Sequence, residues 1–315
     1  MTGDDDLEAR ARLTRSAAFA SIAMALVLGG LKAWAVLRTD STAMLGSLAD
    51  TALDLIASLA TLVGVWIAAR PADRDHRFGH GKAEALAAMF QVVLISLSAV
   101  GLAVRGVTEL LAGGRVAAAG EGVVVSVIAI AGTFALLGWQ RHVIRKTDSI
   151  AIKTDNVHYK SDLALNLGVI AALVLDRYLG LAGADPLFGL AIALWLGWGA
   201  YRASSEAIDH LMDKEWPDFK REQFLAAIAR HPELKGVHDL RTRTSGAQDF
   251  VQFHAMVDGA MSVAEAHRVM DEIELRIERE FPGVEVLIHP DPEGLINETG
   301  AAAQELLPGL AEAHR

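Results

Sequence analysis

The chain has no cysteine among its 315 residues. This absence excludes a disulfide framework, a thiolate zinc site and a cysteine nucleophile, so any metal site must be built from His, Asp and Glu. An excess of positive charge is also missing, because 39 acidic residues outnumber 29 basic ones and the net charge is −10. Nucleic-acid binding depends on clustered Lys and Arg. We therefore expect no nucleic-acid partner.

Hydrophobic residues make up 52% of the chain and the mean hydropathy is +0.30, although 22% of the residues are charged. These values are too apolar for an ordinary soluble domain and too charged for a protein that lies entirely in lipid. The charges are unevenly distributed, since residues 211–315 contain 20 acidic and 11 basic residues, which leaves 19 and 18 before them. The sequence therefore predicts a near-neutral apolar part followed by an acidic part.

Long apolar runs recur through the first two thirds of the chain. A helix needs about 20 apolar residues to cross a hydrocarbon core of roughly 30 Å. The first run is too long for a cleaved signal peptide and has no convincing cleavage site, so it is predicted to be a spanning helix. Six transmembrane helices are predicted, at residues 16–37, 43–69, 83–111, 122–140, 158–178 and 186–212.

Lys and Arg are concentrated in alternate connections between these helices. The N-terminal arm and the second-to-third and fourth-to-fifth connections hold eleven of them, whereas the other three connections hold Arg38, Arg115 and Arg177. Because positively charged connections stay in the cytoplasm, a multi-pass protein of the inner membrane with both termini cytoplasmic is predicted. The predicted divisions are a cytoplasmic arm at 1–15, a transmembrane domain at 16–212, a cytoplasmic domain at 213–294 and a flexible tail at 295–315.

The acidic part predicts a small α+β domain in the order helix, strand, strand, helix, strand. Apolar periodicity favours the helices, and alternation of apolar with polar residues favours the strands. Ser262 and Glu265 have the spacing of a capping box at the start of the second helix. The predicted elements are a helix at 217–231, strands at 237–243 and 250–257 around a turn at 245–247, a helix at 262–281 and a strand at 284–288.

Ionisable residues occur inside two of the predicted transmembrane helices. Asp50 and Asp54, and likewise His158 and Asp162, are four residues apart, which places each pair on one helical face. A carboxylate at membrane depth costs several kcal/mol unless it is paired, protonated or in contact with water. Polar contact between helices is one interpretation, but the neighbouring base, Lys160, is predicted to point to a different side. The pattern favours one divalent-cation site of three carboxylates and one imidazole, a set that suits tetrahedral Zn²⁺.

Two further clusters lie outside these helices. Asp73, His76 and His80 occur in the second-to-third connection, and such residues are found both in metal sites and in ordinary solvated loops. In the acidic domain, the predicted topology brings together the ends of several elements that carry His and Asp. These residues are His238, His254, His267, His289 and Asp291.

Four segments of the chain resemble the cation diffusion facilitator family, most closely its bacterial type that exports ferrous iron and zinc. The segments are Asp50-x-x-x-Asp54 and the runs 71–84, 158–162 and 237–243, in that order. The resemblance extends over nearly the whole chain. It implies a homodimer of six-helix subunits, each with a metallochaperone-like cytoplasmic domain, that exports divalent metal ions in exchange for protons.

The resemblance also implies roles for particular residues. By position, Asp50, Asp54, His158 and Asp162 match the transport site, and Asp73, His76 and His80 match a cytoplasmic loop site. The five residues named above in the acidic domain, His238, His254, His267, His289 and Asp291, match a binuclear site that bridges the cytoplasmic domains of the dimer. Lys82 and Asp213 match a charge pair that holds the membrane and cytoplasmic parts together. Lys160 and Pro290 depart from the family pattern.

The predicted function is proton-coupled export of a divalent metal by alternating access, since metal and protons compete for the same lone pairs. The imidazole favours Zn²⁺ or Cd²⁺, Fe²⁺ stays open, and an all-oxygen site would favour Mn²⁺. A membrane-anchored metal enzyme would need an open metal position and a separate base, and a passive channel would need rings of like charge. A metal sensor without transport would not need the intramembrane acids. We expect the lipid bilayer and a second copy of the chain as partners, and no small organic substrate.

Overall fold

The computed structural model describes residues 3–39, 42–111, 123–179 and 184–294. It divides into a helical unit, Glu8–Asp209, and a second unit that comprises Met1–Leu7 together with the chain from His210 onward. This boundary lies close to residue 212, where the last transmembrane helix was predicted to end. The tail predicted at 295–315 lies outside the described residues.

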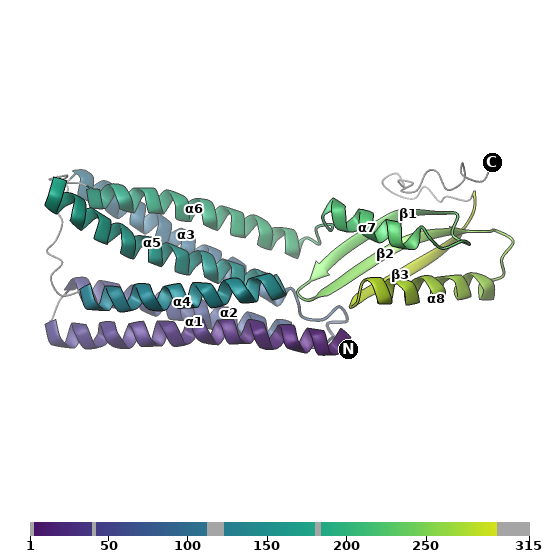
Figure 1. Ribbon diagram of the computed structural model, residues 1–315, viewed down its shortest axis with the longest axis horizontal. Coiled ribbons are helices and arrows are strands. Elements are labelled where there is room, and N and C mark those ends of the chain that lie inside the picture. Colours follow the sequence, from purple (N-terminus) through teal and green to yellow (C-terminus); the bar gives the residue numbers. More distant parts are fainter. Residues whose placement is uncertain (1–2, 40–41, 112–122, 180–183, 295–315) are drawn as a thin grey trace. The chain divides into compact units, whose positions relative to one another are not determined.

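Long helices running beside one another build the helical unit (Figure 1). Within the described residues they are α1 (Gly3–Thr39), α2 (Thr42–Ala68), α3 (Ala83–Leu111), α4 (Val123–Thr147), α5 (Ile150–Leu179) and α6 (Ala184–Leu211). All six predicted apolar runs therefore form helices. In the part of the chain that the structure describes, three stretches are long and apolar enough to cross a membrane by length and composition: Leu7–Trp34, Leu48–Ala68 and Ala83–Leu111. The six-span arrangement stays a prediction.

Two of the predicted connections are mostly helical, so the helices extend beyond the predicted transmembrane spans. Helix α1 begins at Gly3, inside the expected arm. Only Asp148 and Ser149 separate α4 from α5, so the expected connection at 141–157 continues both helices. Hydropathy marks the part of a helix that lies in lipid, but its backbone hydrogen bonds continue through charged residues with good helix propensity.

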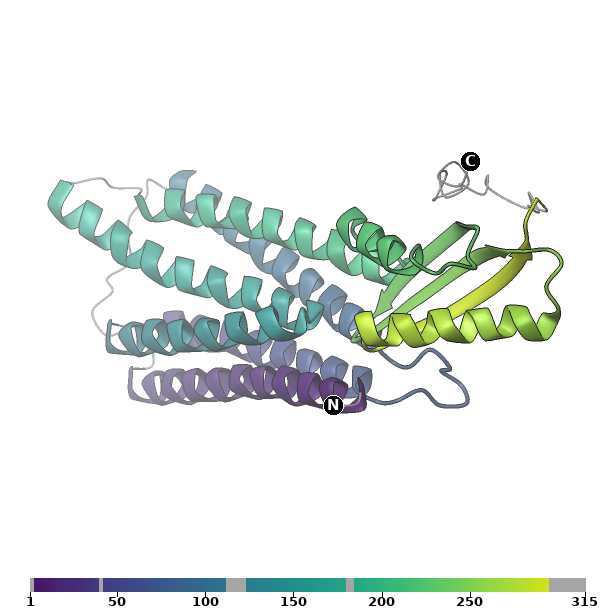
Figure 2. The ribbon, with the colours of Figure 1, turned by 45° about the vertical axis from the view of Figure 1, so that its right-hand side comes forward.

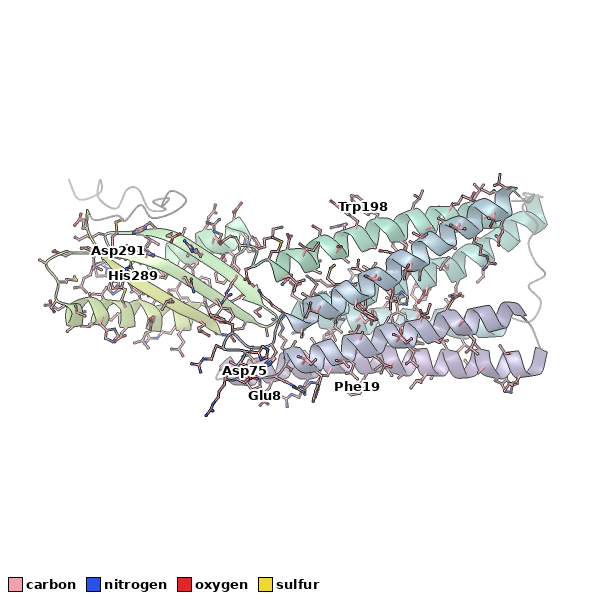
Figure 3. The ribbon with its side chains drawn as sticks, turned by 180° about the vertical axis from the view of Figure 1, so that it is seen from behind. Glu8, Phe19, Asp75, Trp198, His289 and Asp291 are labelled. Carbon is pink, nitrogen blue, oxygen red and sulfur yellow. The ribbon has the colours of Figure 1, made fainter. Side chains whose placement is uncertain are left out.

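Small residues allow the helices to approach closely. Ala17 and Ala18 of α1 pack with Val65 of α2, Val143 of α4 and Ile152 of α5. A second apolar cluster joins α3 to α6. Large apolar side chains cover the outside instead, such as Phe19, which is 58% exposed on the outer side of α1 (Figure 3). This distribution is the one expected of helices that face lipid.

The second unit has the predicted order of elements, α7 (Asp218–Ile228), β1 (Gly236–Ser245), β2 (Gln248–Val257), α8 (Val263–Glu280) and β3 (Val284–Pro292). The strands form one sheet in the order β1-β2-β3, with β1 and β2 antiparallel and β2 and β3 parallel. The predicted capping box at Ser262 and Glu265 is present at the start of α8.

One face of this sheet is covered and the other is open. Val251, Phe253 and Ala255 of β2 pack in the core together with Phe224 of α7 and Ile273 of α8. Both helices thus lie on the same side of the sheet (Figure 2). Because side chains alternate along a strand, the residues between these core positions, including His254, lie on the opposite face.

Candidate metal centres

A cluster of ionisable side chains lies between α2 and α5 inside the helical unit. The Nε2 atom of His158 lies 2.8 Å from Oδ1 of Asp54 and 3.6 Å from Oδ2 of Asp162. One ligand atom from each residue lies within 4.8 Å of the others. Tetrahedral zinc with ligand bonds of about 2.0–2.2 Å would place neighbouring ligand atoms about 3.3 Å apart. The structure therefore brings three of the four predicted transport-site residues together at metal-binding distances.

Asp50, the fourth predicted residue, lies one turn earlier on α2 and is exposed. It is not part of the group formed by Asp54, His158 and Asp162. A base that the sequence analysis did not consider, Lys32 of α1, donates a hydrogen bond of 2.6 Å to Thr51 next to Asp50. Spacing along one helix could not reveal it, because Lys32 reaches the site from another helix.

A buried polar network lies one turn from His158 and was missed by the sequence analysis. Asp155 has no exposed surface, and its carboxylate accepts hydrogen bonds from Ser21 of α1 (2.6 Å), Gln91 of α3 (3.0 Å) and Gln140 of α4 (2.8 Å). Gln91 also donates to Thr61 of α2. The network thus joins five helices. Its signal in the sequence was the glutamines inside apolar runs, whereas Asp155 had been assigned to a connection.

The loop between α2 and α3 brings together Asp73, His76 and His80. Asp73 lies 3.3 Å from Nδ1 of His76 and 3.4 Å from Nε2 of His80. Its carboxylate also accepts hydrogen bonds from the backbone N–H groups of His76 and Asp75, and the first of these is the main reason that the pKa of Asp73 lies below 3.8. A carboxylate that stays ionised is suited to a cation. Nδ1 of His80 is buried and has no hydrogen-bond partner among the described residues.

Strand register builds a third cluster on the open face of the sheet. His238 of β1 pairs with His254 of β2, which pairs with His289 of β3. The rings of His238 and His254 are 4.9 Å apart, and those of His254 and His289 are 4.7 Å apart. Asp291 lies two residues after His289 on β3, and both residues are labelled in Figure 3. Its carboxylate lies 3.1 Å from His238, 2.8 Å from His254 and 3.2 Å from His289.

A β-bulge puts His238 on this face. From the turn to Arg241, β1 pairs regularly with β2. If this register continued, His238 would lie opposite Ala255, on the face covered by the helices. The register shifts between His238 and Arg241, and Asp239 within this step has a φ of 50°, in the left-handed region that Asp tolerates. This shift reverses the alternation, so that His238 faces His254.

The donor set of this cluster suits a metal ion. His238 is buried, and neither of its ring nitrogens has a hydrogen-bond partner of good geometry among the described residues. Buried polar atoms are usually satisfied. A cation held by His238, His254 and Asp291 would satisfy the ring. His267 does not join this group within one chain, because its exposed ring on α8 lies 3.8 Å from Asp271 instead.

The predicted charge pair of Lys82 and Asp213, and Pro290, lie outside these clusters. Lys82 belongs to the helical unit and Asp213 to the second unit, where Asp213 lies 3.6 Å from Arg243, so the predicted Lys82–Asp213 pair stays a prediction. Pro290 lies on β3, an edge strand, where a missing backbone N–H is tolerated.

A fourth group of close ligand atoms, His231, Glu233 and Glu272, is better explained by ion pairing. Arg268 donates hydrogen bonds to Glu272 (2.7 Å) and to Glu233 (3.0 Å). The hydrogen bond from Arg268 is also the main cause that lowers the pKa of Glu272. The guanidinium thus supplies the positive charge that these carboxylates attract.

Comparison with known proteins identifies the family. Residues 18–212 match the family model described as the cation efflux transmembrane domain, and residues 216–293 match the one described as the cation efflux protein, cytoplasmic domain. The chain belongs to the cation efflux family. This is the cation diffusion facilitator family that the four sequence segments resemble. Its members are transporters, so the alternative of a membrane-anchored metal enzyme is excluded.

Relatives in this family match nearly the full length. The cation-efflux pump FieF of Klebsiella pneumoniae is 41% identical over 285 residues, which is 90% of this chain and 95% of the relative. That of Serratia proteamaculans is 40% identical over 296 residues, covering 94% and 98%. A solved structure titled "Mode of Action of a Putative Zinc Transporter CzrB (Zn form)" is 38% identical over 26% of this chain and 94% of that chain, with a TM-score of 0.25. The helical unit is thus the family's transmembrane domain, and the acidic unit is its cytoplasmic domain.

Proposed function

We propose that this protein exports divalent transition-metal ions, Zn²⁺ above all and also Cd²⁺ or Fe²⁺, from the cytoplasm in exchange for protons. The observation that carries the proposal is the cluster of Asp54, His158 and Asp162 between two helices of a transmembrane domain. Ionisable side chains at membrane depth are costly and mark ion pathways. Six helices would cross the inner membrane, with both termini in the cytoplasm.

The charges of this cluster suit a transported ion. Two carboxylates neutralise a divalent cation, and Asp50, one turn away, would complete a set of four ligands when its side chain turns toward His158. The imidazole nitrogen favours Zn²⁺ and Cd²⁺ over Mn²⁺. A site that lies between two helices can open to either side of the membrane without breaking covalent bonds.

Proton coupling follows from the same ligands. Each lone pair that binds the metal also binds a proton, so protons that arrive from one side displace the metal. The loop cluster of Asp73, His76 and His80 would hold a further ion. We further propose that metal at His238, His254 and Asp291 stabilises a homodimer through the cytoplasmic domain, and that His267 takes part across the dimer.

Transport by reconstituted protein tests the proposal. In proteoliposomes with a pH gradient, the wild type should take up Zn²⁺ while protons leave, and Asp54→Asn should lower the rate at least tenfold because a charged ligand is lost. Glu109→Gln is the matched control, since Glu109 forms an exposed ion pair with Arg105 outside the cluster. His158→Asp should shift the preference from Zn²⁺ toward Mn²⁺.

The outcomes separate the proposal from its rivals. A native rate for Asp54→Asn would contradict the assigned site. Zn²⁺ movement without proton movement would indicate a passive channel, and metal binding without any flux would indicate a sensor.

A further inference from the structure

A cavity of about 610 Å³ lies between α5 and α6, within the helical unit and apart from the metal centres. Lys153 and Lys160 line it from α5, and Trp195, Trp198, Tyr201 and Arg202 line it from α6. Lys160 faces this cavity and is exposed, so it points away from His158 and Asp162, as its position on the helix predicted.

Three cations, Lys153, Lys160 and Arg202, line the cavity together with two acids, Glu206 and Asp209. Lys153 forms ion pairs with Glu206 at 2.7 Å and Asp148 at 2.8 Å. Lys160 and Arg202 have no ion pair in the part of the chain that the structure describes. An unpaired cation in a transmembrane helix is costly unless it reaches the interface or meets a negative partner. Two such cations in one cavity favour an anionic occupant.

The position along the helices shows how far the two cations lie from the cytoplasmic ends of α5 and α6. At 1.5 Å per residue, Lys160 lies about 15 Å from the start of α5 at Ile150, and Arg202 lies about 14 Å from the end of α6 at Leu211. The two cations therefore lie at similar depth. Both helix ends adjoin cytoplasmic segments, and long side chains at this depth extend toward the interface.

Aromatic side chains form the lipid-facing edge of the cavity. The rings of Trp198 and Tyr201 stack 5.6 Å apart, and these residues are 60% and 65% exposed. Trp198 points outward from α6 (Figure 3). Trp and Tyr prefer the level between headgroups and acyl chains. A free anion would gain nothing from exposed rings, whereas a phospholipid places its phosphate beside the cations and its glycerol and acyl chains against the rings.

We propose that the cavity between α5 and α6 binds the headgroup of an anionic phospholipid, with Lys160 and Arg202 pairing its phosphate. Basic pockets between transmembrane helices on the cytoplasmic side are suited to such lipids. The approach of α6 to α5 at Gly199, where a Cβ atom would lie 3.0 Å from Val157, places the lipid between two helices in contact. Because α5 also carries His158 and Asp162, the lipid would influence the metal site; this part alone rests on the proposed function.

Tryptophan quenching tests the site directly. Full-length protein in phosphatidylcholine nanodiscs is given a small fraction of brominated phosphatidylglycerol or brominated phosphatidylcholine, and the quenching of fluorescence is followed. We expect preferential quenching by the anionic lipid, and at least tenfold weaker preference in Lys160→Gln/Arg202→Gln. Lys160→Arg/Arg202→Lys should retain it. Arg145→Gln/Lys146→Gln removes two exposed cations of α4 and is the charge-matched control.

Each outcome decides the proposal. Equal quenching by both lipids in the wild type overturns it, as does an unchanged preference in the glutamine variant. Competition by millimolar inorganic phosphate would show a soluble-anion site instead. If the glutamine variant loses the dimer while its quenching stays that of the wild type, a second copy of the chain and not a lipid covers the cavity, and the proposal is overturned. If the double variant does not fold, Arg202→Gln alone is measured. Zn²⁺ transport of the wild type in the same lipids is recorded separately, so failure of the transport function leaves the lipid result intact.

Discussion

At the residue scale, Asp155 shows how one side chain can link many helices. Its carboxylate has no exposed surface and receives donors from three helices, α1, α3 and α4. A buried carboxylate without partners would be very costly, but one that accepts three hydrogen bonds holds its donors in place. The same helix carries His158 one turn later, so the network also holds the helix segment that carries part of the candidate metal cluster.

We predict that Asp155→Ala strongly destabilises the helical unit. The substitution leaves buried donors of Ser21, Gln91 and Gln140 without an acceptor, and each such group costs about 1–3 kcal/mol. The thermal midpoint of the purified protein, followed by size-exclusion chromatography after heating, should fall markedly. The midpoint of Asp155→Asn should fall less, because this side chain keeps one acceptor oxygen. An Asp155→Ala midpoint equal to that of the control Glu109→Ala, a half-buried residue outside the network, would contradict the network's role.

At the element scale, the bulge in β1 decides which face His238 occupies. A strand that contains one extra residue resumes its alternation in the opposite phase. Here the shift between His238 and Arg241 moves His238 to the face of His254. The cluster therefore depends on the number of residues in this part of the strand.

We predict opposite effects for shortening and lengthening β1. Deletion of Asp239 would make the strand regular and keep His238 opposite His254, so metal binding to the cytoplasmic domain should persist. Insertion of a glycine after Asp239, with the bulge retained, would shift His238 by one position along the strand. Its side chain would then point to the face covered by the helices. Isothermal titration of full-length protein with Zn²⁺ should then show the loss of cytoplasmic-domain binding for the insertion only. The same stoichiometry in both variants would refute the role of the bulge.

Helix α8 begins with a capping box whose strength depends on pH. The side chain and backbone N–H of Ser262 each donate to Glu265 at 2.7 Å, and the side-chain hydrogen bond is the main cause that lowers the pKa of Glu265 below 4.5. A carboxyl group whose pKa is lowered by folding stabilises the protein above its unfolded pKa, and the contribution disappears as the pH falls through the folded pKa.

We therefore predict that the capping box stabilises α8 fully at pH 7 and weakens progressively as the pH falls below about 4.5. Ser262→Ala should lower the stability of the cytoplasmic domain by about 1 kcal/mol at pH 7. The difference in stability between the wild type and Glu265→Gln should shrink as the pH falls below the pKa of a glutamate in the unfolded chain. Unfolding followed by circular dichroism from pH 7 to pH 3.5 measures both effects. A difference that grows on acidification would contradict the assignment.

At the scale of the whole molecule, charge and metal ligands are divided between the two units. The segment 211–315 carries 20 acidic and 11 basic residues, and this excess attracts cations to the cytoplasmic side. Metal bound between copies of the cytoplasmic domain would stabilise the dimer by mass action, about 2.7 kcal/mol when the free ion exceeds its Kd by 100-fold.

We predict that Zn²⁺ lowers the dimer dissociation constant about 100-fold under these conditions. Analytical ultracentrifugation in detergent, with Zn²⁺ or with a chelator, measures the shift. His238→Ala/His254→Ala should abolish it, because two ligands of the cluster are removed. His142→Ala is the control, since His142 stacks on Trp139 of α4 outside the metal clusters. Equal dimer stability with and without Zn²⁺ would count against metal bridging.

Local patterns made much of the fold and part of the site predictable. The order of elements in the cytoplasmic domain and the capping box at Ser262 depend on residues that are near in sequence, and both are confirmed. The turn before β2 was marked by Gly246, which adopts a φ of 62°. His158 and Asp162 were recognisable because a four-residue spacing on one helix and the cost of charge in lipid are both properties of a single segment.

The sequence by itself determined the apolar helices, the acidic domain and the residues that can bind metal, because hydropathy, charge and spacing act locally. Only the tertiary structure decided which of these residues meet. It left Asp50 and His267 outside the clusters, brought Lys32 into hydrogen-bond contact with Thr51, buried Asp155 among donors from three other helices, and turned His238 to the open face. The physical reason is that helix packing and strand register depend on contacts between segments that are distant along the chain.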